Sequence, residues 1–185
     1  FQEQVYRTPD DAGNYSRILS PAILFEDDKY KIWCVDQIGT NNIVVAYYEA
    51  SGNNVTSWTH VRDYTITPTD NGVTVRPWHL DVINDSGKYI MLIMCRNGTD
   101  VANNHCSLFI TESADNIAYS APVKVVEGSA HGWDRYMYRS SIVKIGDKYR
   151  IYYSAGTGGP NTIYTDSIWG IGITESSTLN SFVGY

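Results

Sequence analysis

The stretch Ser141-Ile-Val-Lys-Ile-Gly146-Asp147-Lys-Tyr149-Arg-Ile-Tyr-Tyr-Ser154 decides the fold of this chain. Its first half is apolar and β-branched, and its second half alternates Tyr149, Ile151 and Tyr153 with more polar residues. Gly146-Asp147, between the two halves, is typical of a tight hairpin turn. The stretch therefore predicts two antiparallel strands joined by a two-residue turn.

The same pattern occurs twice earlier in the chain, around Lys29-Tyr30 and around Lys88-Tyr89. The three Lys-Tyr pairs, the last at 148/149, are 59 and 60 residues apart. Each repeat has a third apolar run that ends in a similar way, at Glu49-Ala-Ser51, Glu112-Ser113 and Glu175-Ser176. Four strands in a period of about 60 residues are typical of a β-propeller blade. A β-sandwich built of hairpins is the alternative.

The chain is therefore predicted to be an all-β propeller segment of four-stranded antiparallel blades. The blades are expected at about 15–70, 71–130 and 131–185, as part of a longer chain. Within them, strands are predicted near 21–26, 29–36, 43–50, 60–67, 80–84, 88–95, 106–112, 122–127, 140–145, 148–154, 167–174 and 181–185.

The composition of the chain argues against some classes of function. The net charge of -6 argues against general binding to nucleic acid, and no window is long and apolar enough to span a membrane. Three cysteines are present, and Cys34 and Cys95 fall within apolar strand runs. They are predicted to be buried free thiols and not a disulfide framework.

The geometry of a blade predicts at which end of the propeller channel each connecting segment lies. Because successive strands of a blade alternate in direction, the segments before each first strand share one mouth of the channel with the loops between strands two and three. The segments expected at this mouth are 10–20, 36–42, 70–80, 96–105, 128–140 and 155–166. The Lys-Tyr turns are expected on the opposite face, with a structural role.

Four stretches of the chain resemble known propellers. Tyr149-Arg-Ile-Tyr-Tyr-Ser-Ala-Gly156 and Ile171-Gly-Ile-Thr-Glu-Ser176 resemble the five-bladed propellers of glycoside hydrolase family 43 and its relatives. Pro77-Trp-His-Leu-Asp-Val-Ile83 and Met137-Tyr-Arg-Ser-Ser-Ile142 look still more like the propeller platform of receptor-binding tail proteins from phages of Gram-positive hosts, staphylococcal phages in particular. The resemblance covers about residues 15–182 and implies five blades, of which this chain holds about three.

The resembled hydrolases place acidic residues at the starts of three first strands, facing the channel. Glycoside hydrolysis needs two carboxylates beside the scissile bond. Alignment of the repeats on their Lys-Tyr pairs puts these positions at Ser20, His79 and Arg139, and none is a carboxylate. We therefore predict no catalysis by the family mechanism. If the protein is an enzyme, Asp81 and Asp134 are its candidate catalytic carboxylates. No cofactor or metal site is predicted.

The mouth segments are instead rich in basic and aromatic residues. Aromatic faces stack on sugar rings, and arginine holds phosphate or carboxylate through paired hydrogen bonds. The predicted ligand-binding residues are Trp78, His79, Asp81, Trp133, Asp134, Tyr138 and Arg139. His79 and Asp81 are alternatively a hydrogen-bonded pair within the channel. The same segments hold His131, Tyr136 and the recurring Arg17, Arg76 and Arg135, for which the alternative role is to tie neighbouring blades together.

These features together predict a carbohydrate-binding propeller of a phage tail, recognising a host cell-wall glycopolymer such as teichoic acid without catalysis. The alternatives are a family 43-like glycoside hydrolase acting on a poly- or oligosaccharide, and a purely structural platform. The expected partners are the cell-wall glycan and other tail subunits, with a homotrimer implied by the resemblance, and neither nucleic acid nor membrane. The expected location is the virion tail, extracellular on host contact, or secreted in the hydrolase alternative.

Overall fold

The computed structural model describes residues 17–38, 42–96, 106–129, 132–157 and 168–184. All the regular structure within these ranges is β-strand. They contain no helix that is long and apolar enough to cross a membrane.

The strands form three four-stranded antiparallel sheets, in each of which spatial order follows chain order. Blade one consists of β1 (Arg17–Glu26), β2 (Lys29–Ile38), β3 (Asn42–Ser51) and β4 (Thr59–Tyr64). Blade two consists of β7 (Arg76–Asp85), β8 (Lys88–Arg96), β9 (Cys106–Ser113) and β10 (Val123–Glu127). Blade three consists of β11 (Tyr136–Ile145), β12 (Lys148–Gly156), β13 (Trp169–Ser176) and β14 (Val183–Gly184). A small hairpin of β5 (Thr69–Asp70) and β6 (Val73–Thr74) links blades one and two.

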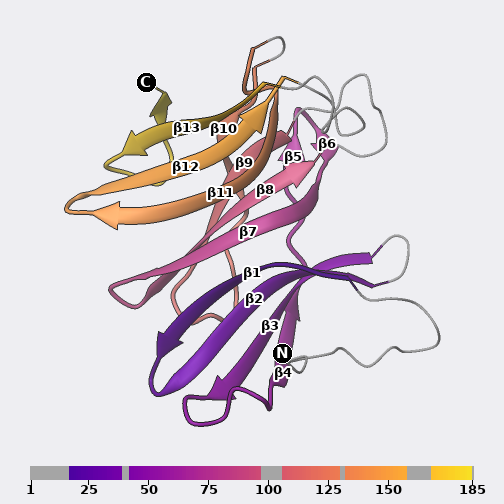
Figure 1. Cartoon of the computed structure of the whole chain (residues 1–185), viewed down its shortest axis with the longest axis vertical. Coiled ribbons are helices and arrows are strands. Elements are labelled where there is room, and N and C mark those ends of the chain that lie inside the picture. The colour runs from indigo at the N-terminus through magenta and orange to yellow at the C-terminus, as the bar shows by residue number, and fades with distance from the viewer. Residues whose placement is uncertain (1–16, 39–41, 97–105, 130–131, 158–167, 185) are drawn as a thin grey trace.

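The three sheets are arranged as propeller blades. The first strand of each sheet is its inner strand, and β7 lies between β1 and β11. The turns β1–β2, β7–β8 and β11–β12 lie on one side of the molecule, at the left of Figure 1. We call this side the turn face, and the opposite side, where the inner strands begin, the mouth. The predicted propeller is therefore confirmed, and so is the separation of the Lys-Tyr turns from the mouth.

Each inner strand begins four residues before its predicted start, at 17, 76 and 136. The reason is a β-bulge, where the register with the second strand shifts between Leu19 and Ala22, Pro77 and His79, and Met137 and Ser140. A bulge interrupts the alternation of side chains, so the part of the strand before it does not show the pattern of the part after it. The hairpin β5–β6 is too short and polar to show any pattern.

Two hydrophobic cores hold the blades together. The core between blades one and two is built around the fully buried Trp33, which packs with Val45, Tyr47, Met91 and Phe109. The core between blades two and three contains Leu92, Leu108, Ile142, Ile151 and Ala155. Cys34, Cys95 and Cys106 are buried free thiols, as predicted for the first two, and burial raises the pKa of Cys34 to about 12.

The tyrosines of the second and third Lys-Tyr pairs lock their blades to the one before. The Tyr89 hydroxyl donates to Glu26 at 2.9 Å and accepts from the Lys31 ammonium at 2.9 Å. In the next blade the Tyr149 hydroxyl donates to Asp85, which also pairs with Lys144. The bond to Asp85, with partial burial, raises the pKa of Tyr149 to about 12. The repeat that identifies the fold is therefore a structural contact, as expected.

A second contact joins blades two and three closer to the mouth. Asp81 on β7 accepts hydrogen bonds from the Ser141 hydroxyl at 2.7 Å and the Ile142 amide at 2.9 Å. Its other oxygen accepts from the amide of Val82 at 3.0 Å. Asp81 therefore satisfies donors on two neighbouring inner strands.

The outer face of blade three is open. Ile171 and Ile173 are 68% and 41% exposed. The residues at the same positions of blade two, Leu108 and Ile110, are 0% and 3% exposed because blade three covers them. Blade three thus presents the same kind of apolar face that is covered in the blades before it.

The β1–β2 turn carries a strain that a single substitution should remove. Asp27 and Asp28 both have positive φ, 53° and 57°, whereas the β7–β8 turn has Gly87 at the second position. We expect Asp28→Gly to raise the free energy of unfolding by about 0.5–1 kcal/mol, because glycine adopts positive φ without the steric cost. Chemical denaturation measures this, and Gly87→Asp is the reciprocal variant, which should lose stability. Equal stabilities for Asp28→Gly and the parent would contradict the prediction.

The role of Asp81 predicts a stability defect. Asp81→Ala should lower the free energy of unfolding by about 1–3 kcal/mol, because the amide of the buried Ile142 and the Ser141 hydroxyl lose their acceptor. Urea titration followed by tryptophan fluorescence measures the change. Asp147→Ala, in the exposed β11–β12 turn, is the matched control and should leave stability unchanged.

Candidate functional site

The three bulges place side chains at the mouth, on the inner edge of each blade. They fall at Ser20, at Trp78 and at Tyr138-Arg139. Ser20 has a φ of 49°, in the left-handed region that non-glycine residues rarely adopt. Bulges turn side chains away from the regular alternation of a strand and are common beside binding sites. The mouth is therefore the first candidate for a functional surface.

Two of the three positions that align with the acidic residues of the resembled hydrolases are in direct contact. The Ser20 hydroxyl hydrogen-bonds the Nδ1 atom of His79, and both side chains are buried, at 8% and 5% exposure. The His79 Nε2 atom is also buried and has no hydrogen-bond partner among the residues that the structure describes. Burial, followed by the positive charge of Arg139, lowers the pKa of His79 to about 4. His79 is therefore neutral at neutral pH.

Around His79 runs a continuous row of rings and cations, which we call the mouth row: Arg96, Trp78, His79, Tyr138, Arg139 and Trp169. The Arg96 guanidinium lies over the Trp78 ring at 5.0 Å, and Trp78 meets His79 edge to face at 6.3 Å. The Tyr138 ring lies 4.6 Å from that of His79 and 6.1 Å from that of Trp169 between ring centroids, and in both pairs the ring planes are near-perpendicular. The Arg139 guanidinium lies 5.9 Å from the Tyr138 ring centroid.

The mouth row joins blades two and three and is partly open to solvent. Tyr138 and Trp169 are 40% and 39% exposed, and Arg139 is exposed as well. Partly exposed rings that are held in place by neighbouring rings are suited to stacking on a sugar ring. The arrangement combines such rings with arginines that can bind hydroxyls or anions.

Trp133 lies apart from the mouth row. Its ring is stacked on Tyr153 at 6.1 Å and lies against Gly170, where an added Cβ would come within 3.0 Å of it. Gly170 and Trp169 are successive strand residues, so Trp133 and Trp169 lie on opposite faces of β13. Trp133 is nevertheless 41% exposed and provides a second aromatic surface.

The two candidate catalytic carboxylates do not lie in the mouth row. Asp81 is bound to Ser141 and Ile142 in the contact between blades, so the alternative of a His79–Asp81 pair is wrong. Asp134 accepts from the amide and hydroxyl of Ser129 and stabilises its own loop. Local and inter-blade hydrogen bonds therefore account for both carboxylates, and the ligand-binding role predicted for them has no support from their contacts.

Of the remaining residues predicted at the mouth, the structure describes some and not others. Arg76 is exposed, and Arg135 is half-buried against the ring of Tyr136. His131 and the side chain of Arg17 lie outside the described part of the chain. Within that part, no three His, Cys, Asp or Glu side chains are arranged to hold a metal ion.

Sequence reasoning missed Trp169 and Arg96 as members of this site. Trp169 begins the Trp169-Gly-Ile-Gly172 run, in which Gly172 makes room for Tyr153 and Gly170 for Trp133. Alternating glycines in a strand indicate close approach by bulky rings. This alternation can be seen in the sequence alone. Arg96 gave no such signal, because it follows an apolar strand and its neighbours come from another strand.

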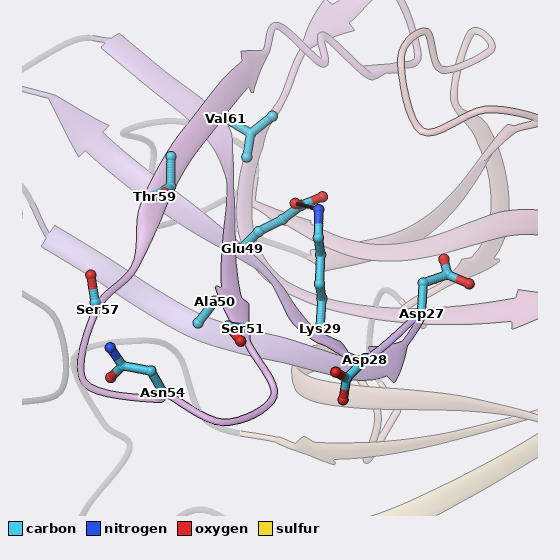
Figure 2. A pocket seen from close by; sticks show the side chains of 10 residues that line it. All are labelled: Asp27, Asp28, Lys29, Glu49, Ala50, Ser51, Asn54, Ser57, Thr59 and Val61. Carbon is cyan, nitrogen blue, oxygen red and sulfur yellow. Dashed lines mark hydrogen bonds and ion pairs between the residues drawn. The ribbon is translucent and has the colours of Figure 1, made fainter.

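A separate polar hollow lies on the turn face of blade one. Its volume is about 580 Å³, and Figure 2 shows Lys29 reaching toward Glu49 within it. Their charged atoms are 2.8 Å apart, and Asp27, Asp28, Ser51 and Asn54 contribute to the same wall. The hollow is on the opposite side of the molecule from the mouth row.

The buried His79 predicts a pH dependence of stability. Its folded pKa of about 4 lies below its ordinary value of 6.5, so the unfolded state takes up the proton first as the pH falls. We expect the free energy of unfolding to drop by up to about 3 kcal/mol between pH 6.5 and 4 through this group, with its full contribution kept above pH 6.5. His79→Gln should lack this part of the drop in urea titrations. Parallel pH profiles for the parent and His79→Gln would contradict the prediction.

Comparisons with known proteins place the fold. No protein-family model and no curated protein matches the sequence. Among solved structures, an N-acetylgalactosamine deacetylase from F. plautii matches with a TM-score of 0.66 and 22% identity, over 89% of this chain and 51% of that one. A family 117 glycoside hydrolase of Zobellia galactanivorans matches with a TM-score of 0.68 and 13% identity, over 92% and 55%.

An α-L-arabinofuranosidase from Lactobacillus brevis matches with a TM-score of 0.65 and 16% identity, over 97% of this chain and 57% of that one. The chain thus spans about half the length of the solved structures that it matches. At these identities the likeness shows the fold alone. The chain has the all-β fold of the propellers found among glycoside hydrolases.

Proposed function

We propose that this protein binds carbohydrate at the mouth of its propeller and does not hydrolyse it. The observation that carries the proposal is the mouth row, in which partly exposed aromatic rings alternate with a neutral histidine and arginines across two blades. Aromatic stacking and a few directed polar groups are the usual means by which proteins hold sugars. The solved structures of similar fold include carbohydrate-active proteins, which supports the same ligand class.

Binding without hydrolysis is favoured by what stands at the inner strands. Ser20, His79 and Arg139 occupy the aligned positions, and the nearby Asp81 and Asp134 are engaged in structural hydrogen bonds. A glycosidase needs one carboxyl group as acid and a second as base or nucleophile. The described mouth residues offer no such free pair, so the hydrolase alternative has less support than the binding role.

The narrower proposal is a host-attachment role. The resemblance of the Pro77–Ile83 and Met137–Ile142 segments to phage tail platforms supports a cell-wall glycopolymer, of teichoic acid type, as the ligand. A virion tail location, with other tail subunits as partners, is part of the same proposal. The acidic net charge does not oppose it, because the arginines concentrate positive charge locally at the mouth.

We also propose that these three blades form part of a larger ring. The exposed Ile171 and Ile173 occupy positions that the following blade covers in blades one and two. A further blade packing on this face would bury them in the same manner.

The central test is glycan binding by variants of the mouth row. Trp169→Ala should weaken binding to purified Gram-positive cell walls by about 1–3 kcal/mol, roughly 5- to 150-fold, because a stacking face is lost. Co-sedimentation gives the retention, and calorimetry with released wall glycan gives the affinity. Trp58→Ala, at the outer edge of blade one, is the matched control and should bind as the parent does.

A reducing-end assay on the same glycans, and on arabinan and xylan, tests for hydrolysis. We expect no released ends. Hydrolysis that disappears in Asp81→Asn or Asp134→Asn would show that these carboxylates are catalytic and would overturn the proposal. Equal wall binding by Trp169→Ala and the parent would show that the mouth row is not the binding surface.

A further inference from the structure

Two arginines face each other at the mouth end of blade two. Arg76, the first residue of β7, is the direct cross-strand partner of Arg96, the last residue of β8. Like charges directly opposite each other in an antiparallel pair are destabilising. Because such a pair costs stability, stability does not explain its presence at the mouth end of blade two.

Neither arginine is neutralised by a carboxylate in the part of the chain that the structure describes. Arg76 is exposed, and the contact that holds Arg96 is the face of Trp78 at 5.0 Å. The basic residues of the turn face behave differently, since Lys29, Lys31, Lys144, Lys148 and Arg150 all pair with acidic side chains. Among the described residues, Arg76 and Arg96 thus differ from these paired cations of the turn face.

We propose that Arg76 and Arg96 form an oxyanion site, which binds a phosphate or carboxylate group carried by the glycan. The inference rests on the proposed function and deepens it. It names the charge of the ligand's binding group and a second binding position besides the aromatic rings of the mouth row. Two guanidinium groups on adjacent strands present several donors to one oxyanion and lose their mutual repulsion when it binds. Stacking on Trp78 orients the Arg96 guanidinium before the ligand arrives.

The position of the pair also predicts how charge is spaced on the ligand. Arg96 is at one end of the mouth row, while Arg139 is next to Tyr138 on blade three. Trp78, His79 and Tyr138 lie between these arginines, and His79 is neutral at neutral pH. The mouth row thus fits a glycan with negative groups on either side of an uncharged sugar face, which is the pattern of a polymer charged at regular intervals.

Calorimetric titration with matched ligands tests the site. The probes are tetragalacturonate, its methyl ester, a glycerol phosphate oligomer and inorganic tripolyphosphate, each at 50 and 300 mM NaCl. We expect Arg76→Gln and Arg96→Gln to weaken the preferred charged oligomer at least tenfold and the methyl ester less than twofold. Salt should weaken parent binding more than variant binding, because screening acts on the lost charges.

Three further variants make the result specific. Lys29→Gln removes the same charge from the turn-face hollow of Figure 2 and should leave all affinities unchanged. Arg96→Lys keeps the charge without the planar fork and should fall between Arg96→Gln and the parent. Trp169→Ala should weaken charged and methyl-esterified oligomers alike. Melting curves should show no loss of stability in Arg76→Gln, since repulsion between the arginines is removed.

The outcomes separate the two proposals. Parent-like binding of the charged oligomers by both arginine variants, with weak binding by Trp169→Ala, overturns the oxyanion site and leaves the proposed function standing. Binding of tripolyphosphate that Arg96→Gln abolishes, with no binding of any glycan, keeps the oxyanion site and overturns the proposed function. Absence of binding by every probe overturns both. A preference between the phosphate and carboxylate oligomers identifies the source of the oxyanion.

Discussion

The structure depends on one interaction: the apolar face of one blade packs against the apolar face of the next. Trp33 and Val45 of blade one are covered by blade two, and Leu92 and Leu108 of blade two are covered by blade three. Polar contacts fix how the faces meet, with Tyr89 and Tyr149 at the turn face and Asp81 nearer the mouth. Hydrophobic burial supplies most of the stabilisation, while the directed hydrogen bonds select one alignment of the blades.

That alignment is what makes a site at the mouth. Because β7 packs against both β1 and β11 and the three blades share one strand register, the bulges at Ser20, Trp78 and Tyr138-Arg139 occupy equivalent places in successive blades. The repeat then brings together residues that differ between blades, and those differences carry the chemistry. At equivalent positions of successive blades, the turn face repeats a contact between a tyrosine and an acidic residue. At the mouth, the equivalent positions of the three blades hold a serine, a histidine and an arginine.

The mouth is electrostatically unlike the rest of this acidic protein. On the turn face nearly every described lysine is paired with a carboxylate, whereas Arg76, Arg96 and Arg139 contact rings or solvent. Burial and Arg139 together keep His79 uncharged, so it contributes hydrogen bonding without adding to the positive charge. This surface is fixed by the fold, since its rings contact one another and its bulged backbone is set by the blades.

The sequence by itself determined the blade repeat. The Lys-Tyr period, the hairpin turns and the apolar alternation after each bulge are local patterns, so they predicted the strands, the all-β propeller and the turn face. They also pointed to Trp78, His79, Tyr138 and Arg139 as mouth residues. Only the tertiary structure decided the partners of these residues. Asp81 bonds Ser141, Arg96 faces Arg76, and Trp169 joins Tyr138 because of strand register, bulges and packing between blades. Those relations connect residues distant in the chain, and no periodicity along it encodes them.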